Sequence, residues 1–160
     1  MSTGLIIFTI FHVAISLVGI VAGLVAAAGM VKSKLCKKTT AVFLWGTVAT
    51  SVTGFFFPFN GFTPAIGTGI FSLLILPFAF LALYGKKLAG PWRWIYVISA
   101  MLSLYLNCFV LVVQTFQRVP ALQSTPPVPP SGPLFASAQG IVFVVFVVWT
   151  ILAVRRFRPA

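Results

Sequence analysis

The stretch that decides the fold is Leu5–Val31, LIIFTIFHVAISLVGIVAGLVAAAGMV, followed directly by the basic segment Lys32–Lys38, KSKLCKK. A helix needs roughly 20 predominantly apolar residues to cross about 30 Å of hydrocarbon. The run is long enough for such a crossing and too long for the apolar part of a signal peptide, and no basic segment precedes it. We therefore expect a retained transmembrane helix that ends at the lysines.

The composition extends this expectation to the whole chain. Hydrophobic residues make up 60% of the 160 residues and charged residues 7%, and the mean hydropathy is +1.12. A soluble domain carries about 25% charged residues, so the bilayer must be the solvent for most of this chain. The runs are continuously apolar, which favours helices over the alternating strands of a β-barrel. We predict one all-α domain, 1–160, an integral membrane bundle of five transmembrane helices at about 5–31, 40–57, 64–84, 94–116 and 134–154.

The positive charges predict an orientation. The chain has 11 Lys and Arg and no Asp or Glu. Of these 11, only Arg118 falls in a loop on the same side as the N-terminus, the proline-rich loop 117–133. Cytoplasmic loops carry the excess of Lys and Arg, so we expect the N-terminus outside, the C-terminus inside and a bacterial inner membrane. The other ten are expected to contact anionic lipid headgroups: Lys32, Lys34, Lys37, Lys38, Lys86, Lys87, Arg93, Arg155, Arg156 and Arg158.

Polar residues inside the spans are the candidate functional positions, because they are costly in hydrocarbon. On the first span, His12, Ser16, Gly19 and Gly23 share one helical face, and the two glycines form a small-residue motif that lets another backbone approach. This face predicts packing within the bundle, in a homo-oligomer or in a larger complex. With the predicted topology the candidate ligand-binding residues gather in the outer half: His12, Ser16, Thr50, Thr53, Ser72, Asn107 and Gln114.

Two interpretations of this outer group stay open. It forms a shallow polar cavity for a small amphiphile, such as a lipid or a quinone headgroup. Alternatively, its members only tie helices together through hydrogen bonds of about 0.6 kcal/mol each.

The residues that are missing narrow the chemistry. Without Asp or Glu the chain has no carboxylate pair for acid–base catalysis and no carboxylate metal site. One histidine cannot ligate a haem from both sides, although two copies of the chain could. Cys36 and Cys108 are expected at different depths and unpaired. We predict no catalytic residue, no metal site and no bound nucleic acid.

Several motifs carry a resemblance to a known group of proteins. They are Thr50–Phe59, Trp92–Val97, Tyr105–Asn107, Phe109–Gln114 and Val119–Leu122, together with the span that contains His12. In this combination the chain resembles a family of small hypothetical bacterial inner-membrane proteins, and more loosely the DoxX-like membrane proteins linked to quinone redox systems. The resemblance implies no activity. Members of the family often carry an acidic residue after the Phe-Pro-Phe turn and a second histidine at the start of span three, where this chain has Asn60 and no histidine near Ile66.

These observations lead to three hypotheses. The first is a non-enzymatic structural or accessory subunit of the inner membrane that binds a lipid or quinone. The second is a redox-linked membrane subunit that uses His12 with a bound quinone or haem. The third is a small-solute transporter, which five spans without an internal repeat make less attractive.

Overall fold

The computed structural model describes residues 2–58, 61–122 and 130–159. These residues form a helical bundle, which confirms the predicted all-α class and the five long helices. The elements are α1 (Thr3–Val31), α2 (Lys37–Gly54), α3 (Pro64–Phe80), the π-helical turn η1 (Leu81–Gly85), α4 (Trp92–Arg118), the 3-10 turn η2 (Pro120–Leu122) and α5 (Pro133–Arg156).

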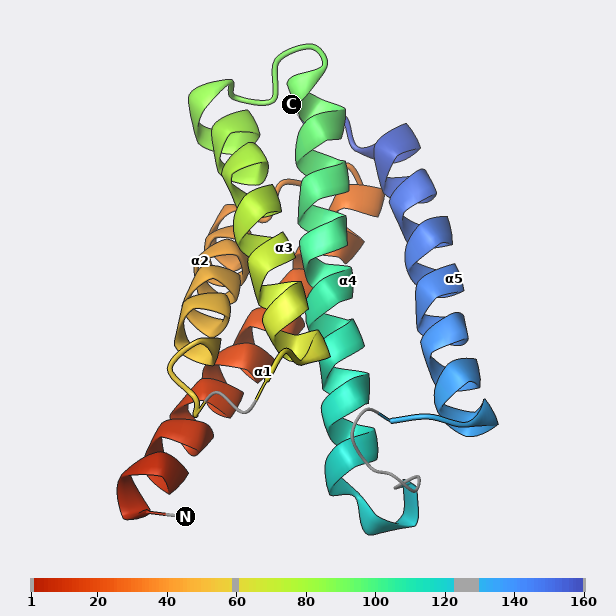
Figure 1. The fold of residues 1–160 in the computed structure, drawn as a ribbon. Coiled ribbons are helices and arrows are strands. Elements are labelled where there is room, and N and C mark those ends of the chain that lie inside the picture. The colour runs from red at the N-terminus through yellow and green to blue at the C-terminus, as the bar shows by residue number, and fades with distance from the viewer. Residues whose placement is uncertain (1, 59–60, 123–129, 160) are drawn as a thin grey trace.

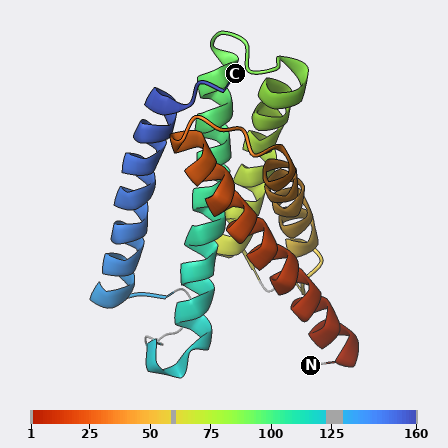
Figure 2. The ribbon, with the colours of Figure 1, turned by 180° about the vertical axis from the view of Figure 1, so that it is seen from behind.

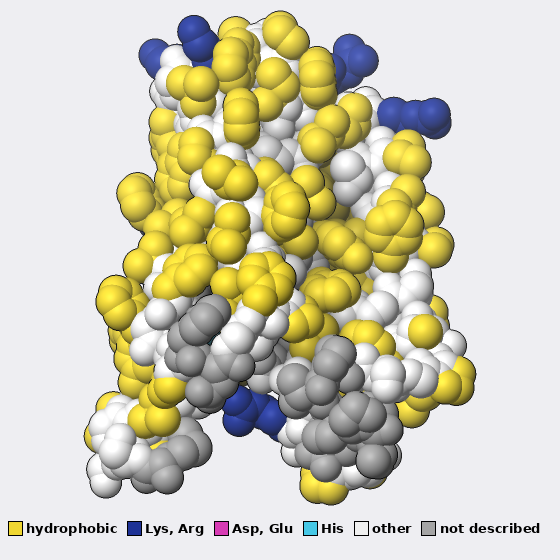
Figure 3. Space-filling model, viewed as in Figure 1, with side chains coloured by type: hydrophobic (Ala, Val, Ile, Leu, Met, Phe, Trp, Pro, Cys, Tyr) yellow, Lys and Arg dark blue, Asp and Glu magenta, His cyan; other side chains and the backbone are white. Residues whose placement is uncertain are grey.

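Successive helices run up and down the bundle (Figure 1). The α1–α2 connection, the η1–α4 connection and the C-terminus lie at one end, which we call the cationic end because ten of the 11 Lys and Arg belong to these segments. The N-terminus, the α2–α3 connection and the start of α5 lie toward the opposite end, the far end. Figure 3 shows several basic groups along the upper edge, one at the lower end and hydrophobic side chains over the flank between them.

The helices do not pack equally. The most extensive contacts join α1 to α2, α3 to α4 and α4 to α5, and the bundle core lies toward the cationic end. In the described part of the chain α5 packs against α4 and α1 but against neither α2 nor α3. Seen from behind, α1 crosses the bundle obliquely, and its N-terminal half leaves α4 and α5 (Figure 2). The far end is therefore more open than the cationic end.

Four helices are long and apolar enough to cross a membrane: α1, α3 with η1, α4 and α5. The second predicted span is the exception. The α2 helix covers Lys37–Gly54 instead of 40–57, and its 18 residues include two lysines and six Thr or Ser residues. It ends before Phe55 because Pro58 disfavours a helical Phe57, and the last turn is closed by 3.2 Å and 3.1 Å bonds from the amides of Phe55 and Phe56.

The third span is helical over the predicted range, but it is not a regular helix throughout. Thr63 begins α3 by accepting a 3.3 Å hydrogen bond from the Ile66 amide, and Pro64 occupies the first turn, where no amide is needed. Pro77 lies inside the helix and removes one backbone donor. Beyond it the helix widens into η1, and the Lys86 amide donates to the Leu81 carbonyl at 2.8 Å.

The proline-rich loop is shorter than predicted. Its first two residues, Gln117 and Arg118, continue α4, and its last, Pro133, begins α5 at a position that proline favours. Within the loop, Pro120–Leu122 form the turn η2, and residues 123–129 lie outside the described part.

Candidate functional site

The outer candidate residues do not form one cavity. The structure brings four of the seven together between α1 and α2: His12, Ser16, Thr50 and Thr53. Asn107 is part of a separate tie between α4 and α2, Gln114 lies near the far end of α4, and Ser72 is buried on α3.

The α1–α2 group is a ladder of hydrogen bonds between two helices. His12 Nδ1 lies 2.8 Å from Thr53 Oγ1. One turn further along, the Ser16 hydroxyl is 3.2 Å from Thr50 Oγ1 and 2.7 Å from the His12 carbonyl oxygen. These polar side chains face each other because Gly19 and Gly46 let the two backbones approach closely. A Cβ added at Gly46 would lie 3.2 Å from the Gly19 Cα.

The hydrogen-bond network assigns the tautomer of His12. Thr53 has one hydroxyl proton, and its Oγ1 is 2.7 Å from the Ala49 carbonyl oxygen, which can only accept. The Thr53 hydroxyl therefore donates to Ala49 and accepts from the Nδ1–H of His12. The ring is neutral because the chain has no Asp or Glu that could pair with a charged imidazole in these apolar surroundings. The other ring nitrogen, Nε2, then carries a lone pair and is an acceptor. Within the described residues this atom has no hydrogen-bond partner.

An aromatic ring packs against the imidazole at the far end of the bundle. The Phe57 ring packs edge-on against His12 with centroids 5.0 Å apart, and Phe8 lies 4.9 Å from Phe57. The His12 side chain is half-buried. The site thus offers one hydrogen-bond acceptor next to apolar rings, a combination suited to the polar head of an amphiphile.

The remaining candidates act inside the bundle. The Asn107 amide donates to Thr47 Oγ1 at 2.9 Å, which places these two residues at the same depth in the bundle. Gln114 Oε1 accepts from Arg118 Nε at 3.1 Å within α4. No described hydrogen bond joins Ser72, which is 2% exposed, to the His12 group.

Sequence reasoning missed two participants. One is Phe57, which was not among the candidate residues and packs against the imidazole. Gln139, an amide within the last apolar run, ties α5 to α4 by donating to the Phe109 carbonyl at 3.1 Å. Its Oε1 is buried without a hydrogen-bond partner in the described structure. A long polar side chain in an apolar span is the sequence feature that could have identified Gln139.

The small-residue face of α1 is used within the chain. Gly23 lies against Phe43 and Leu104, and Gly19 lies against Gly46. The predicted oligomer or larger complex stays a prediction, and it would need surfaces other than these two glycines.

The cationic residues lie where the sequence placed them relative to one another, at one end of the bundle. All are exposed except Arg93, which is half-buried and donates to the Phe157 carbonyl at 2.8 Å. Lys86 lies 5.6 Å from the centroid of the Trp92 ring, a cation–π contact.

The grooves described next are not lined by any of the seven outer candidates. One runs along α1 past Leu17, Val21 and Val25, and the other lies between α4 and α5. Both cysteines are free, as predicted, and no group of three or more metal-binding side chains occurs among the described residues.

Comparisons with protein-family models, curated proteins and solved structures give no match to this chain. The function must therefore be argued from the fold and the site alone.

Proposed function

We propose that this chain is a non-enzymatic accessory protein of the bacterial inner membrane that binds an amphiphile in its outer half. All five helices cross the bilayer, with the N-terminus outside and the C-terminus inside. The gathering of ten cations at one end supports this orientation, because the cytoplasmic side of a membrane protein carries its basic residues.

The helix α2 also crosses the bilayer, although its composition is polar for a membrane span. Its 18 residues extend over about 27 Å, close to the hydrocarbon thickness. The polar side chains are sheltered by the neighbouring helices, since Thr40, Thr47 and Ser51 are buried and Thr50 and Thr53 bond to α1. A neighbour that supplies hydrogen bonds lowers the cost of a polar residue in hydrocarbon.

One observation carries the binding function: the Nε2 lone pair of His12, held in place by Thr53 and flanked by Phe57. An ionisable side chain within a span that serves only packing would be expected to satisfy both nitrogens inside the protein. The free acceptor suits a headgroup hydroxyl, as in a quinol or a hydroxyl-bearing lipid, rather than a headgroup that can only accept.

Binding is tested with protein purified in lipid nanodiscs and titrated with a short-chain quinol and with its oxidised quinone. The quinol is expected to bind about fivefold more tightly, since one hydrogen bond contributes about 1 kcal/mol. His12→Leu is expected to abolish this preference, whereas Thr9→Ala, which removes a hydroxyl that bonds only to the Leu5 carbonyl of its own helix, leaves it unchanged.

Two results would overturn the assignment. One is equal affinity for quinol and quinone in the native protein. The other is a preference that persists in His12→Leu. A lipid as the natural ligand is recognised separately, by mass spectrometry of the amphiphiles that copurify with native protein and are lost from His12→Leu.

The second candidate function is a redox-linked subunit, favoured by the same free Nε2, which is also a ligand atom for haem iron. Because one chain supplies one histidine, this function needs two copies for bis-histidine ligation. Purified protein with a haem absorption band that disappears in His12→Leu would support it, and a colourless native protein would exclude the haem version.

A further inference from the structure

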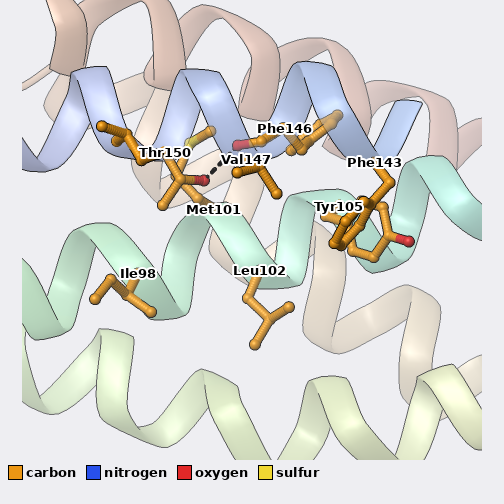
Figure 4. A pocket seen from close by; sticks show the side chains of 9 residues that line it. Ile98, Met101, Leu102, Tyr105, Phe143, Phe146, Val147 and Thr150 are labelled. Carbon is orange, nitrogen blue, oxygen red and sulfur yellow. Dashed lines mark hydrogen bonds between the residues drawn. The ribbon is translucent and has the colours of Figure 1, made fainter. Parts of the chain in front are cut away.

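The groove between α4 and α5 exists because α5 has few neighbours. Within the described structure α3 packs on α4 but not on α5, so the surface of α4 between them is left uncovered. The groove has a volume of about 270 Å³ and is lined mainly by Ile98, Leu102, Tyr105, Val147, Thr150 and Ile151. Figure 4 shows the lining side chains of α4 and α5, which run side by side.

The lining is suited to hydrocarbon. Apart from Tyr105, the only lining residue with a hydroxyl is Thr150. This hydroxyl already donates to the Phe146 carbonyl at 2.7 Å. Ile98, Leu102, Val147 and Ile151 are each 40–47% exposed, so the groove is open along its side. A chain of methylene groups lying in it would bury this apolar surface.

The groove leads to a positive charge. Val147, Ile151 and Arg155 are four residues apart and lie in line on one face of α5. On α4, the residue one turn before Ile98 is Trp94, which is 45% exposed and of the type that favours the membrane interface. Arg155 is exposed, and the sequence contains no Asp or Glu that could neutralise it. Arg155 is therefore available to an anionic group from outside the chain, such as a lipid phosphate.

The length of the groove matches one leaflet. From Phe143, at its inner limit, to Arg155 the helix rises about 18 Å, and half of the hydrocarbon thickness is about 15 Å. An acyl chain that reaches Phe143 thus places its phosphate beside Arg155.

From these observations we infer that the α4–α5 groove is a binding site for an anionic phospholipid of the leaflet at the cationic end. One acyl chain occupies the groove, Arg155 binds the phosphate, and Trp94 lies at the level of the ester groups. The site is independent of the His12 site, since it involves other helices at the other end of the bundle. It rests on the proposed function only in that the chain spans the bilayer.

The inference is tested by native mass spectrometry of delipidated protein in detergent, titrated with phosphatidylglycerol or with phosphatidylcholine of the same acyl length. The native protein is expected to retain phosphatidylglycerol preferentially. Arg155→Gln weakens its binding about fivefold, because a cation near the surface contributes about 1 kcal/mol. Arg118→Gln, which removes the cation at the far end, leaves it unchanged.

A second pair of variants tests the groove itself. Val147→Trp fills the groove and is expected to lower phosphatidylglycerol binding severalfold, whereas Val148→Trp points to another face and has no effect. The inference would be overturned if the two variants bound phosphatidylglycerol equally, or if the native protein bound the two lipids equally. It would also be overturned if a second copy of the protein covered the groove. If Val147→Trp does not fold, the comparison of Arg155→Gln with Arg118→Gln tests the inference.

The two binding proposals fail separately. His12→Leu is expected to leave phosphatidylglycerol binding intact, and Arg155→Gln is expected to leave the preference for quinol intact. Loss of both properties in one of these variants would show that neither site has been located correctly.

Discussion

At the scale of single residues, the two glycines of the small-residue motif have different surroundings. A Cβ added at Gly23 would lie 2.5 Å from Leu104 Cδ1 and 2.8 Å from Phe43 Cδ2. The nearest atom to a Cβ at Gly19 is 3.6 Å away, an ordinary contact. The motif alone does not distinguish the two positions.

We therefore predict that Gly23→Ala destabilises the bundle and that Gly19→Ala does not. Overpacking costs about 1–3 kcal/mol, which exceeds the gain of about 1 kcal/mol from replacing glycine by alanine in a helix. Thermal unfolding in detergent should show a lower Tm for Gly23→Ala and an unchanged or raised Tm for Gly19→Ala. The reverse order would mean that the α1–α2 packing differs from that described.

The Asn107–Thr47 hydrogen bond is the second prediction at this scale. A double-mutant cycle with Asn107→Leu and Thr47→Val should give a coupling of about 0.6 kcal/mol, the average for such ties in membrane proteins. The unfolding free energy in detergent is the measurement. Additive effects of the two substitutions would show that the residues do not interact.

At the scale of elements, the short segment after α5 closes the cationic end. The Phe157 side chain is fully buried, 5.8 Å from the Tyr96 ring between centroids. Its carbonyl accepts from Arg93, and the following Arg158 amide donates to Ser33 Oγ at 2.8 Å. The segment thus ties α5 to α4 and to the end of α1, which compensates for the few neighbours of α5.

Phe157→Ala is accordingly expected to destabilise the protein by about 3 kcal/mol, the lower range for removing a buried phenylalanine. The matched control is Phe56→Ala, because Phe56 is 71% exposed and should change the Tm little. Equal Tm values for the two variants would contradict the docking of the C-terminal segment.

At the scale of the whole molecule, the orientation proposal depends on whether α2 crosses the membrane. If it does, the chain ends on opposite sides, and if it does not, both ends lie on the same side. A phosphatase fused to the C-terminus is expected to be inactive, because this enzyme works only outside the cytoplasm. A phosphatase inserted in the loop after Leu122 is expected to be active.

The N-terminus completes that measurement. A cysteine introduced at Ser2, in a variant that lacks Cys36 and Cys108, should react with a membrane-impermeant thiol reagent in intact cells. Labelling at Ser2 together with an active C-terminal phosphatase would place both ends outside and leave four spans.

Sequence reasoning predicted most of the fold and only part of the site. The apolar runs predicted the five helices, and four of the described helices are long and apolar enough to cross about 30 Å of hydrocarbon. The boundaries of α2 differ because its ends are set by capping and by Pro58, not by hydropathy. Spacing placed His12 and Ser16 on one face, but their partners Thr53 and Thr50 lie on another helix.

What the sequence by itself determined is the set of apolar helices and the collection of cations at one end, since both follow from local composition. Only the tertiary structure decided which faces meet: the Thr53 bond that leaves His12 Nε2 free, the burial of Phe157 and the uncovered α4–α5 groove. The physical reason is that apolar residues surround most of these helices, so hydropathy does not specify their rotation. The opening stretch Leu5–Val31 thus dictates a helix, whereas its glycines and its one histidine acquire their roles from α2 and α4.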